Sequence, residues 1–284
     1  GGRIPASEVQ GLAAAQLSRA CGDGGQELAQ WLAGLAAQPL VAVDAEQPQQ
    51  LAALARVVRA SPRPVLAQSA ASWIRALAAL PPQPLAGADL VALRRRGRDG
   101  EPLRGLVLVG SHVPLADAQL ASLLAEPLCT GLELPVARLA QLLEAPLPSA
   151  LLACLERDWL LELGEILAGG RTPVLYSSRG EFPCASVAAR RRLGDGLAAL
   201  MGRLVGALAP QLAYLISKGG TTTHALLADG LGLAAVELQG QLLPGLSLVL
   251  TPAELPVLTF PGNLGDPGTL RQAWRLMEGL ESCP

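Results

Sequence analysis

The sequence predicts an α/β fold, built on an open, mainly parallel sheet with helices on both faces. Strand-length apolar runs alternate with segments whose apolar residues recur at helical spacing, as in the series 39–43, 49–60, 64–67 and 70–80. Glycines and small polar residues follow several of these runs, which is typical of the turns between strands and helices. This alternation is characteristic of doubly wound sheets, and it divides into a shorter first block and a longer second block.

The composition is that of a globular chain with an aliphatic core. Half of its 284 residues are hydrophobic, and only 3% are aromatic. The formal net charge of −2, from 22 basic and 24 acidic residues, does not favour a nucleic acid or a membrane as the partner. No apolar run approaches the roughly 18 residues of a membrane-spanning helix. The five cysteines are scattered without a C-x-x-C pair, so we expect free thiols in a reducing compartment, the cytoplasm by default.

The first block is expected to contain strand–helix units after an N-terminal helix. We predict that this helix opens near Arg3, that further helices span 26–37, 49–60 and 70–80, and that strands span 39–43 and 64–67. A proline-rich break follows, and residues 86–104 are rich in proline, glycine and arginine. We therefore place a domain boundary there and interpret 86–104 as a linker. Its arginine run, 94–98, is interpreted as a solvated segment, with a phosphate clamp as the alternative.

The second block is predicted to hold the main sheet. Its predicted strands are 105–110, 128–134, 151–155, 172–176, 213–216, 233–238, 246–250 and 256–259. Its predicted helices are 118–124, 136–144, 156–168, 185–208 and 269–280. The run 105–110 is apolar almost throughout, which indicates a strand that is buried on both faces.

One segment of the second block, residues 213–230, is the strongest candidate for a ligand site. It is predicted to form a buried strand, a glycine turn and a helix that begins with threonines. A helix start has unpaired N–H groups and a partial positive charge, so it suits an anion, and glycines allow close approach. Donors would come from Gly220, Thr221 and Thr222, and a full charge from Lys218. Because Lys218 precedes the glycines, the segment lacks the G-x-x-x-x-G-K-[ST] order, and a tight turn without a ligand stays the alternative.

Three further loops place glycines or small polar residues directly after predicted strands. They lie at 110–111, 177–178 and 262–265. In open parallel sheets, ligands bind outside the carboxyl ends of the strands, so these loops and the central one form a constellation. A single loop of this kind would be weak support, because strand–helix turns commonly use glycine and serine.

The histidines and two aspartates lie close to these loops. The two histidines, His112 and His224, are predicted to be helix-start or supporting residues. No carboxylate stands at a spacing from either that would indicate a catalytic pair. Asp117 and Asp266 are predicted to cap helices, with ligation of magnesium as the alternative.

Together these loops resemble the four-carbon acid sugar kinase family. The segments that carry the resemblance are, in order, GLVLVGSHVPLADAQL at 105–120, YSS at 176–178, SKGGTTT at 217–223 with 240–245 downstream, and PGNLG at 261–265. Each motif is short, but their order and spacing across the second block make the combination fairly specific. The resemblance implies the later half of an acid-sugar-binding domain at 1–85, the linker at 86–104 and a nucleotide-binding domain at 105–284.

The resemblance also implies an activity and a set of site residues. Members of the family use ATP to phosphorylate the terminal hydroxyl of a small acid sugar such as threonate, erythronate or oxo-tetronate. We accordingly expect ATP and Mg²⁺ as cofactors and an acid sugar as the small-molecule partner. The implied nucleotide-binding residues are Ser111, Lys218, Gly219, Gly220, Thr221, Thr222, Gly262 and Asn263.

Two departures from the family pattern bear on catalysis. The family opens with two aspartates followed shortly by Thr-Gly, and no such motif stands before residue 40. Since the chain begins with Gly1 rather than Met, we expect its N-terminal part, and the catalytic base with it, to be missing. Phe260 stands where many members have lysine, which removes a phosphate charge. These departures favour the alternative function, a non-catalytic nucleotide- or metabolite-binding module. The oligomeric state is left open, with a homo-oligomer as one possibility.

Overall fold

The computed structural model describes residues 5–36, 38–79, 84–85, 87–144, 148–180 and 182–281. The chain forms two compact units, residues 1–82 and 83–284, and each is described by itself. The predicted helix ends at Arg3, Ala37 and Leu80 lie outside the described residues. In the described part of the chain, no helix combines the length and apolar character that crossing a membrane requires.

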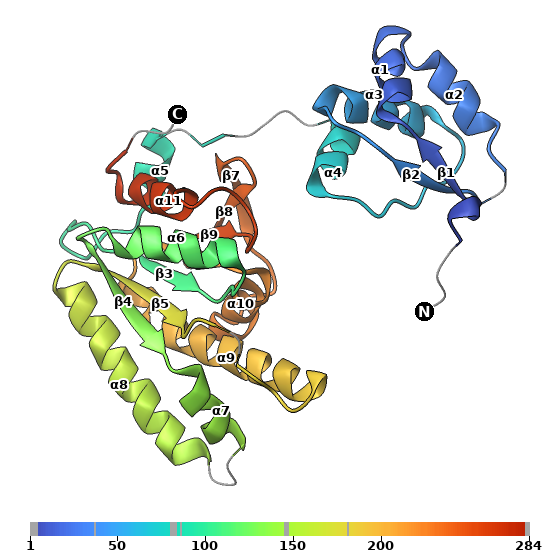
Figure 1. The fold of residues 1–284 in the computed structure, drawn as a ribbon. Helices are drawn as coiled ribbons and strands as arrows, with labels where there is room; N and C mark the ends of the chain where they lie inside the picture. The colour runs from blue at the N-terminus through green and yellow to red at the C-terminus, as the bar shows by residue number, and fades with distance from the viewer. Residues whose placement is uncertain are drawn as a thin grey trace. The chain divides into compact units, whose positions relative to one another are not determined.

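The second unit is built on a seven-stranded sheet, which confirms the predicted fold class (Figure 1). Its strands are β3 (Leu106–Val109), β4 (Cys129–Leu134), β5 (Thr172–Ser177), β6 (Leu215–Lys218), β7 (Glu237–Leu243), β8 (Leu246–Leu250) and β9 (Pro256–Phe260). Their order across the sheet is β4-β5-β3-β6-β9-β8-β7. The strands from β4 to β9 in this order are parallel, and β8 and β7 extend the sheet antiparallel at one edge.

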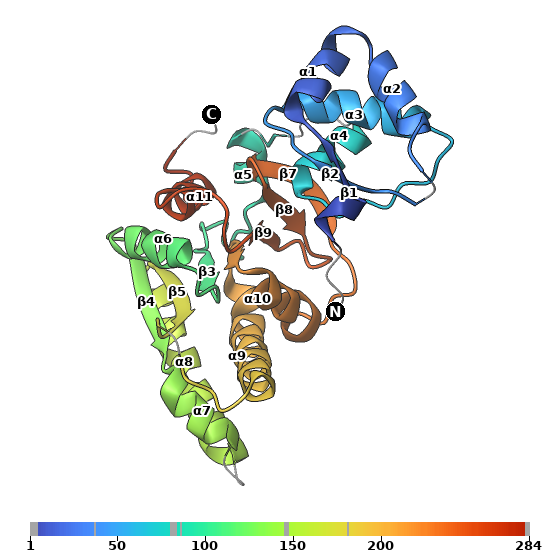
Figure 2. The same ribbon diagram turned by 45° about the vertical axis from the view of Figure 1, so that its right-hand side comes forward.

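Helices cover both faces of this sheet, and the alternating side chains of β3 reach both cores (Figure 2). Val107 and Val109 belong to one core, while Leu106 and Leu108 belong to the other. The first core is covered by α5 (Gly87–Leu93), α6 (Pro114–Leu124) and α11 (Thr269–Glu278). The second is covered by α7 (Val136–Glu144), α8 (Pro148–Ala168) and α9 (Val187–Leu208), with α10 (Gly220–Ala225) and a π-helical turn (Leu226–Gly230) packed on α9. Burial on both faces explains why β3 is apolar throughout.

The stretch 86–104, predicted to be a linker, packs with the second unit. Helix α5 buries Leu90 in the first core. The arginine run is solvated only in part: Arg96 and Arg98 are exposed as predicted. Arg94 instead donates to the main-chain oxygen of Glu278 at 2.6 Å and Arg95 to that of Ala209 at 2.9 Å. The charged composition of the run concealed these contacts, since long arginine side chains bury their stems while their guanidinium groups find acceptors.

A buried acidic residue organises the amino ends of β5 and β6. The carboxylate of Glu278 is 1% exposed and lies 2.7 Å from Arg104 and 3.4 Å from Arg94. It also accepts hydrogen bonds from the hydroxyls of Tyr214 at 2.7 Å and Thr172 at 3.2 Å. A buried carboxylate is tolerated only when charges and hydrogen bonds compensate its lost hydration, and these four groups do so.

The first unit is a smaller α/β unit around a two-stranded parallel sheet. Its described elements are a 3₁₀ turn (Ala6–Glu8), β1 (Val9–Leu12), α1 (Ala14–Gly22), α2 (Gln26–Ala33), β2 (Leu40–Val43), α3 (Pro48–Ala60) and α4 (Ala71–Ala78). A core that includes Leu12, Leu17, Leu28 and Leu54 joins the sheet to these helices.

Four elements differ from the sequence-based expectation. The predicted N-terminal helix is interrupted by β1, which pairs with β2, because the four residues Val-Gln-Gly-Leu are too short a segment to show a helical or a strand period. Residues 64–67 form no strand, and Leu66 is fully exposed. Residues 151–155 belong to α8 rather than to a strand, which accords with the high helix propensity of alanine and leucine. The strand predicted at 233–238 is shifted toward the C-terminus, because β7 begins only at Glu237 and ends at Leu243. The remaining predicted strands and helices are present within a few residues of their expected positions.

Replacing Glu278 with alanine is expected to destabilise the second unit strongly. The change leaves Arg94 and Arg104 without their shared acceptor, and breaking such a buried pair costs about 3 kcal/mol. The matched control is Glu281→Ala, which removes an exposed ion pair with Arg275 and should cost about 0.5 kcal/mol. Urea denaturation of both variants measures the difference, and equal losses would contradict the role assigned to Glu278.

Candidate functional site

The four polar loops singled out in the sequence lie at one edge of the sheet. They follow β5, β3, β6 and β9, which are direct neighbours and run parallel, so their carboxyl ends meet. From β3 the chain continues to β4 and β5, which lie on one side of β3 in the sheet. From β6 it continues to β7, β8 and β9, which lie on the opposite side. Ligands of open α/β sheets bind at such a switch point. The topology therefore brings the predicted constellation together.

Glycines allow three of these loops to touch. A Cβ atom on Gly110 would lie 1.9 Å from Thr222 Oγ1, and one on Gly262 would lie 2.6 Å from Ser111 Oγ. A Cβ atom on Gly219 would lie 3.3 Å from the main-chain nitrogen of Ser111. The loops after β3, β6 and β9 therefore form one packed surface, and larger residues would push them apart.

The start of α10 is the exposed part of this surface. Gly219 precedes the helix with a φ of 117°, a conformation that favours glycine, and no side chain caps the helix. The next residues, Gly220 and Thr221, are exposed, while Thr222 is buried. The first N–H groups of a helix have no partner within it, so those of residues 220–222 are suited to an anion.

Lys218 ties this region to the loop after β9. It is the only lysine in the chain, and it is fully buried. Its Nζ donates to the main-chain oxygens of Pro261 and Gly262, each at 3.2 Å, and lies 4.0 Å from the centre of the Phe260 ring. Burial lowers its pKa from 10.5 to about 8. The structure thus shows Lys218 holding the loop, and its predicted contact with a nucleotide stays a prediction.

The loop after β9 is also held from α6. The fully buried Gln119 donates from Nε2 to the main-chain oxygens of Leu264 at 3.0 Å and Asp266 at 2.7 Å. Asp266 does not cap α11 as predicted, because the N-cap is Gly268 and no side chain caps this helix. Its carboxylate accepts from the main-chain N–H of Gly268 at 2.7 Å, in the turn that precedes the helix. Asn263 lies exposed in this loop, where a ligand can reach it. Gln119 was missed because a polar residue inside a predicted helix gives no signal of what it contacts.

The loop after β5 adds an arginine that the sequence interpretation passed over. Arg179 contacts Asp117 through Nε at 2.5 Å and through Nη2, and its Nη2 also donates to the main-chain oxygen of Ser111 at 2.6 Å. Asp117 lies in the first turn of α6, but among the described residues it makes no capping hydrogen bond, and its partner is Arg179. The Ser177-Ser178 pair drew attention to this loop, whereas Arg179 was interpreted as part of the turn.

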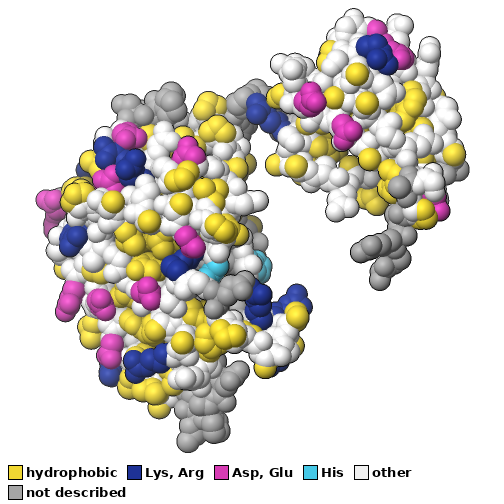
Figure 3. Space-filling view, in the orientation of Figure 1, with side chains coloured by type: hydrophobic (Ala, Val, Ile, Leu, Met, Phe, Trp, Pro, Cys, Tyr) yellow, Lys and Arg dark blue, Asp and Glu magenta, His cyan; other side chains and the backbone are white. Residues whose placement is uncertain are grey.

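The histidines occupy supporting positions on this side of the unit. His112 Nε2 lies 2.8 Å from Ser177 Oγ. Desolvation of the ring and the charges of Arg179 and Arg190 lower the pKa of His112, which favours its neutral form. His224 lies exposed on α10. Figure 3 shows histidine side chains beside basic and acidic ones on the displayed face of the molecule.

The described residues do not form a dedicated metal cage. They contain no group of three or more His, Cys, Asp or Glu side chains that could hold a metal ion. Asp117 and Asp266, the carboxylates considered for magnesium, are engaged by Arg179 and by the start of α11. Mg²⁺ is commonly held by substrate phosphates, water and one or two carboxylates, so it would enter this site with a nucleotide.

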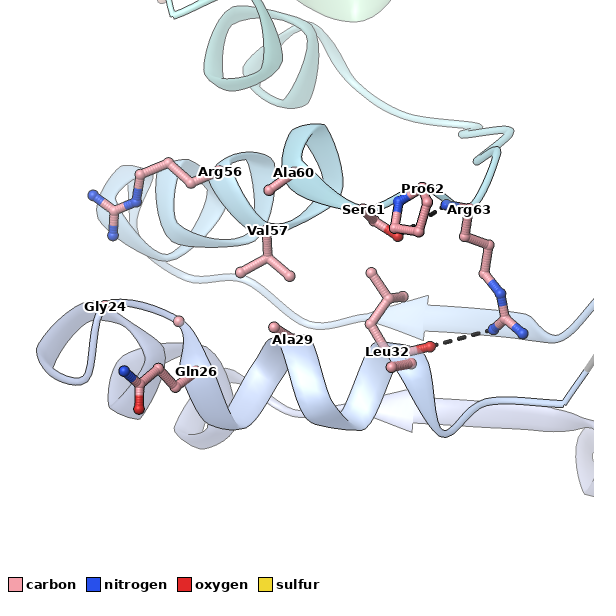
Figure 4. Close-up of a pocket in the computed structure, with 12 residues that line it drawn as sticks. Gly24, Gln26, Ala29, Leu32, Arg56, Val57, Ala60, Ser61, Pro62 and Arg63 are labelled. Atoms are coloured by element: carbon pink, nitrogen blue, oxygen red, sulfur yellow. Dashed lines mark hydrogen bonds between the residues drawn. The ribbon is translucent and has the colours of Figure 1, made fainter.

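The first unit contains a groove between α2 and α3 that lacks converging polar groups (Figure 4). Its volume of about 610 Å³ is sufficient for a small ligand. Ala29, Leu32, Val57 and Ala60 make its lining largely apolar. The guanidinium of Arg63 donates to the main-chain oxygen of Leu32 at 3.2 Å, so it satisfies a carbonyl group at the C-terminal end of α2. We therefore place the candidate site in the second unit.

Residues 106–270, more than half of the chain, match the family described as nucleotide-binding C-terminal domain. The chain belongs to this family. The predicted membership of the four-carbon acid sugar kinase family is thereby confirmed, and nucleotide binding is the property that this domain is named for. No curated protein matches the sequence.

The solved structures similar to the chain include two whose likeness extends over nearly all of it. One, "the putative tRNA synthase" from Salmonella typhimurium LT2, is 17% identical with a TM-score of 0.61, over 94% of this chain and 59% of its own. The other, a domain of unknown function (DUF1537) from Bordetella bronchiseptica with bound citrate in a domain-swapped dimer, is 21% identical with a TM-score of 0.48, over 96% of this chain and 60% of its own. The chain thus matches about three fifths of each, and the first likeness supports the fold alone.

Replacing Gly110 with alanine is expected to separate the loops after β3 and β6. The new Cβ atom would overlap Thr222 Oγ1, and relieving such overpacking costs about 1–3 kcal/mol. Gly194→Ala is the control, because that helical glycine has open space around it and should gain about 0.5–1 kcal/mol. Thermal unfolding compares the two, and a stable Gly110→Ala protein would show that the loops are not in tight contact.

The side chain of Lys218 is expected to titrate near pH 8. Because the chain has one lysine, ¹³C labelling of lysine gives a single side-chain signal in an NMR titration. Burial disfavours the ammonium form, so its pKa lies about 8 in the folded chain against 10.5 in an exposed lysine. A midpoint near 10.5 would show that the side chain reaches solvent instead.

The same shift makes stability depend on pH. Between about pH 8 and 10.5 the unfolded chain binds the lysine proton more tightly than the folded chain, so the Lys218 contribution raises the free energy of unfolding with pH. Cys129, whose pKa burial raises from 9.0 to about 12, contributes in the opposite direction above pH 9. The free energies of unfolding of wild type and Lys218→Met should therefore be compared between pH 8 and 9. In this range only that of the wild type should rise with pH.

Proposed function

We propose that the protein is an ATP-dependent kinase of small four-carbon acid sugars and that the edge formed by the ends of β3, β6 and β9 holds the phosphates of ATP. The observation that carries this proposal is the uncapped start of α10, packed between two glycine-containing loops in a domain of the nucleotide-binding family. The chain spans about three fifths of the structures it resembles, so the substrate and the catalytic activity are part of the proposal.

The proposed roles follow from the needs of phosphoryl transfer. That reaction depends mainly on positioning and on neutralising the charge of the phosphates. The N–H groups at the start of α10 would bind phosphate oxygens, with Thr221 exposed beside them. Ser111, Gly262 and Asn263 would form the rest of the contact surface. Mg²⁺ would neutralise phosphate charge when bound with the nucleotide.

The acceptor is proposed to be an acid sugar, bound with the help of the domain at residues 1–85. We assign no catalytic base, because the family motif expected to supply one is absent from this sequence. The alternative function is a non-catalytic nucleotide- or metabolite-binding module. One observation favours it: the ammonium of Lys218 is engaged by two carbonyls and by the ring of Phe260, so the site lacks an uncommitted lysine beside the phosphates.

Calorimetric titration with ATP and Mg²⁺ tests the binding part of the proposal. We expect the wild-type chain to bind, and Gly220→Val to lose at least tenfold in affinity, because its side chain would occupy the place of the phosphates. The structure leaves open space around Gly220, so the variant should fold. Gly164→Val, at a helical glycine of α8 with similar space, is the control and should bind like the wild type.

A phosphorylation assay separates the kinase from the alternative. The full-length protein is incubated with ATP, Mg²⁺ and a panel of threonate, erythronate and oxo-tetronate, and ADP release is measured with and without each acid. Acid-dependent ADP release supports the kinase. Binding of ATP without turnover of any acid supports the binding module. No binding at millimolar ATP overturns the kinase and the nucleotide-binding form of the alternative.

A further inference from the structure

Arg179 links the end of β5 to the loop that follows β3. Its Nη2 donates to the main-chain oxygen of Ser111 at 2.6 Å, and its Nε donates to Asp117 Oδ1 at 2.5 Å. The side chain of Arg179 is 20% exposed and that of Asp117 is 45% exposed, so the arginine is the better shielded partner. One guanidinium therefore joins a backbone carbonyl and a carboxylate, which a planar fork of donors does well.

The backbone that carries Arg179 is itself fixed. The main-chain N–H of Ser178 donates to Leu134 O at 2.9 Å, and its hydroxyl accepts from the main-chain N–H of Val136 at 3.0 Å. Gly180 follows with a φ of 94°, a conformation that favours glycine. Arg179 thus extends toward the loop after β3 from an anchored position, and movement of that loop would break its bond to Ser111.

The carbonyl that Arg179 holds belongs to the residue where the loops meet. Ser111 lies against both Gly219 and Gly262, and its own position decides how closely they approach. Arg179 Nη1 is buried and has no hydrogen-bond partner in the described part of the structure. An unpaired buried donor is unfavourable, so stability alone does not explain this arrangement.

We propose that Arg179 is a positioning residue of the nucleotide site, which fixes the main chain of Ser111 while Asp117 orients the guanidinium. This inference rests on the proposed function, since the site it serves is the ATP site. Lysine should not replace it, because an ammonium lacks the planar geometry that joins the two acceptors. The role is indirect: Arg179 acts on the nucleotide through Ser111.

Titration with ATP and Mg²⁺ tests the inference on four proteins: wild type, Arg179→Ala, Arg179→Lys and Arg203→Ala. We expect both Arg179 variants to bind about tenfold more weakly, the size of effect found for groups that orient ligand-binding residues. Arg203→Ala is the matched control, because Arg203 also pairs with a carboxylate, Glu156, but on α9 and α8, away from these loops. It should bind like the wild type.

Chemical rescue distinguishes positioning from a general loss of folding. Millimolar guanidinium, far below denaturing concentrations, should restore much of the affinity of Arg179→Ala by filling the vacated place, and should leave wild type and Arg203→Ala unchanged. Should Arg179→Ala fail to fold, Arg179→Lys and Asp117→Asn address the same contacts with little change in size. Asp117→Asn keeps an acceptor but loses the charge, so we expect a smaller loss.

The possible outcomes distinguish a failure of this inference from a failure of the proposed function on which it rests. If wild type binds no nucleotide, the proposed function is wrong and the inference is wrong with it. If wild type binds and the folded Arg179 and Asp117 variants bind equally well, the inference alone is overturned. Weaker binding in the Arg179 variants, with rescue by guanidinium and an unaffected Arg203→Ala, supports it.

Discussion

The close approach of the loops after β3 and β6 is the constraint on which the candidate site depends. The main chain of Gly110 lies against the side chain of Thr222 and leaves no room for a Cβ atom. A similar contact between Gly262 and Ser111 brings in the loop after β9. Because β3, β6 and β9 are parallel neighbours, these contacts set the start of α10 between two other loops. The site is therefore a consequence of strand order as much as of any single motif.

The two edges of the sheet have different chemistry. At the amino ends of the strands, the buried carboxylate of Glu278 is balanced by two arginines and two hydroxyls. At the carboxyl ends, the buried ammonium of Lys218 is offset, within the described part of the chain, by two main-chain oxygens and the ring of Phe260. The carboxylate of Glu278 is thus compensated by opposite charges, whereas no carboxylate of the described residues is bound to Lys218. An anion at the second edge would supply the missing negative charge.

The sequence predicted the parallel sheet and the gathering of four loops, because apolar runs and the glycines after them are local signals. It did not predict contacts between distant side chains. Arg179 follows a strand as many turn residues do, and nothing in its spacing reveals that it contacts Ser111 and Asp117. The stretch 86–104 had the composition of a linker, and its burial depends on acceptors in α11 that come much later in the chain. The strand expected at 64–67 is absent because an apolar run forms a strand only where a partner strand is in reach.

The most direct test of the account is the NMR signal of Lys218 during titration with ATP and Mg²⁺. This side chain is the only lysine, and it lies at the proposed phosphate site. Phosphates bound beside it should shift the signal and raise its pKa above the value of about 8 in the free protein, because negative charge favours the ammonium form. If calorimetry shows that ATP binds while the signal and the pKa of Lys218 stay unchanged, the nucleotide binds elsewhere and the central claim is wrong.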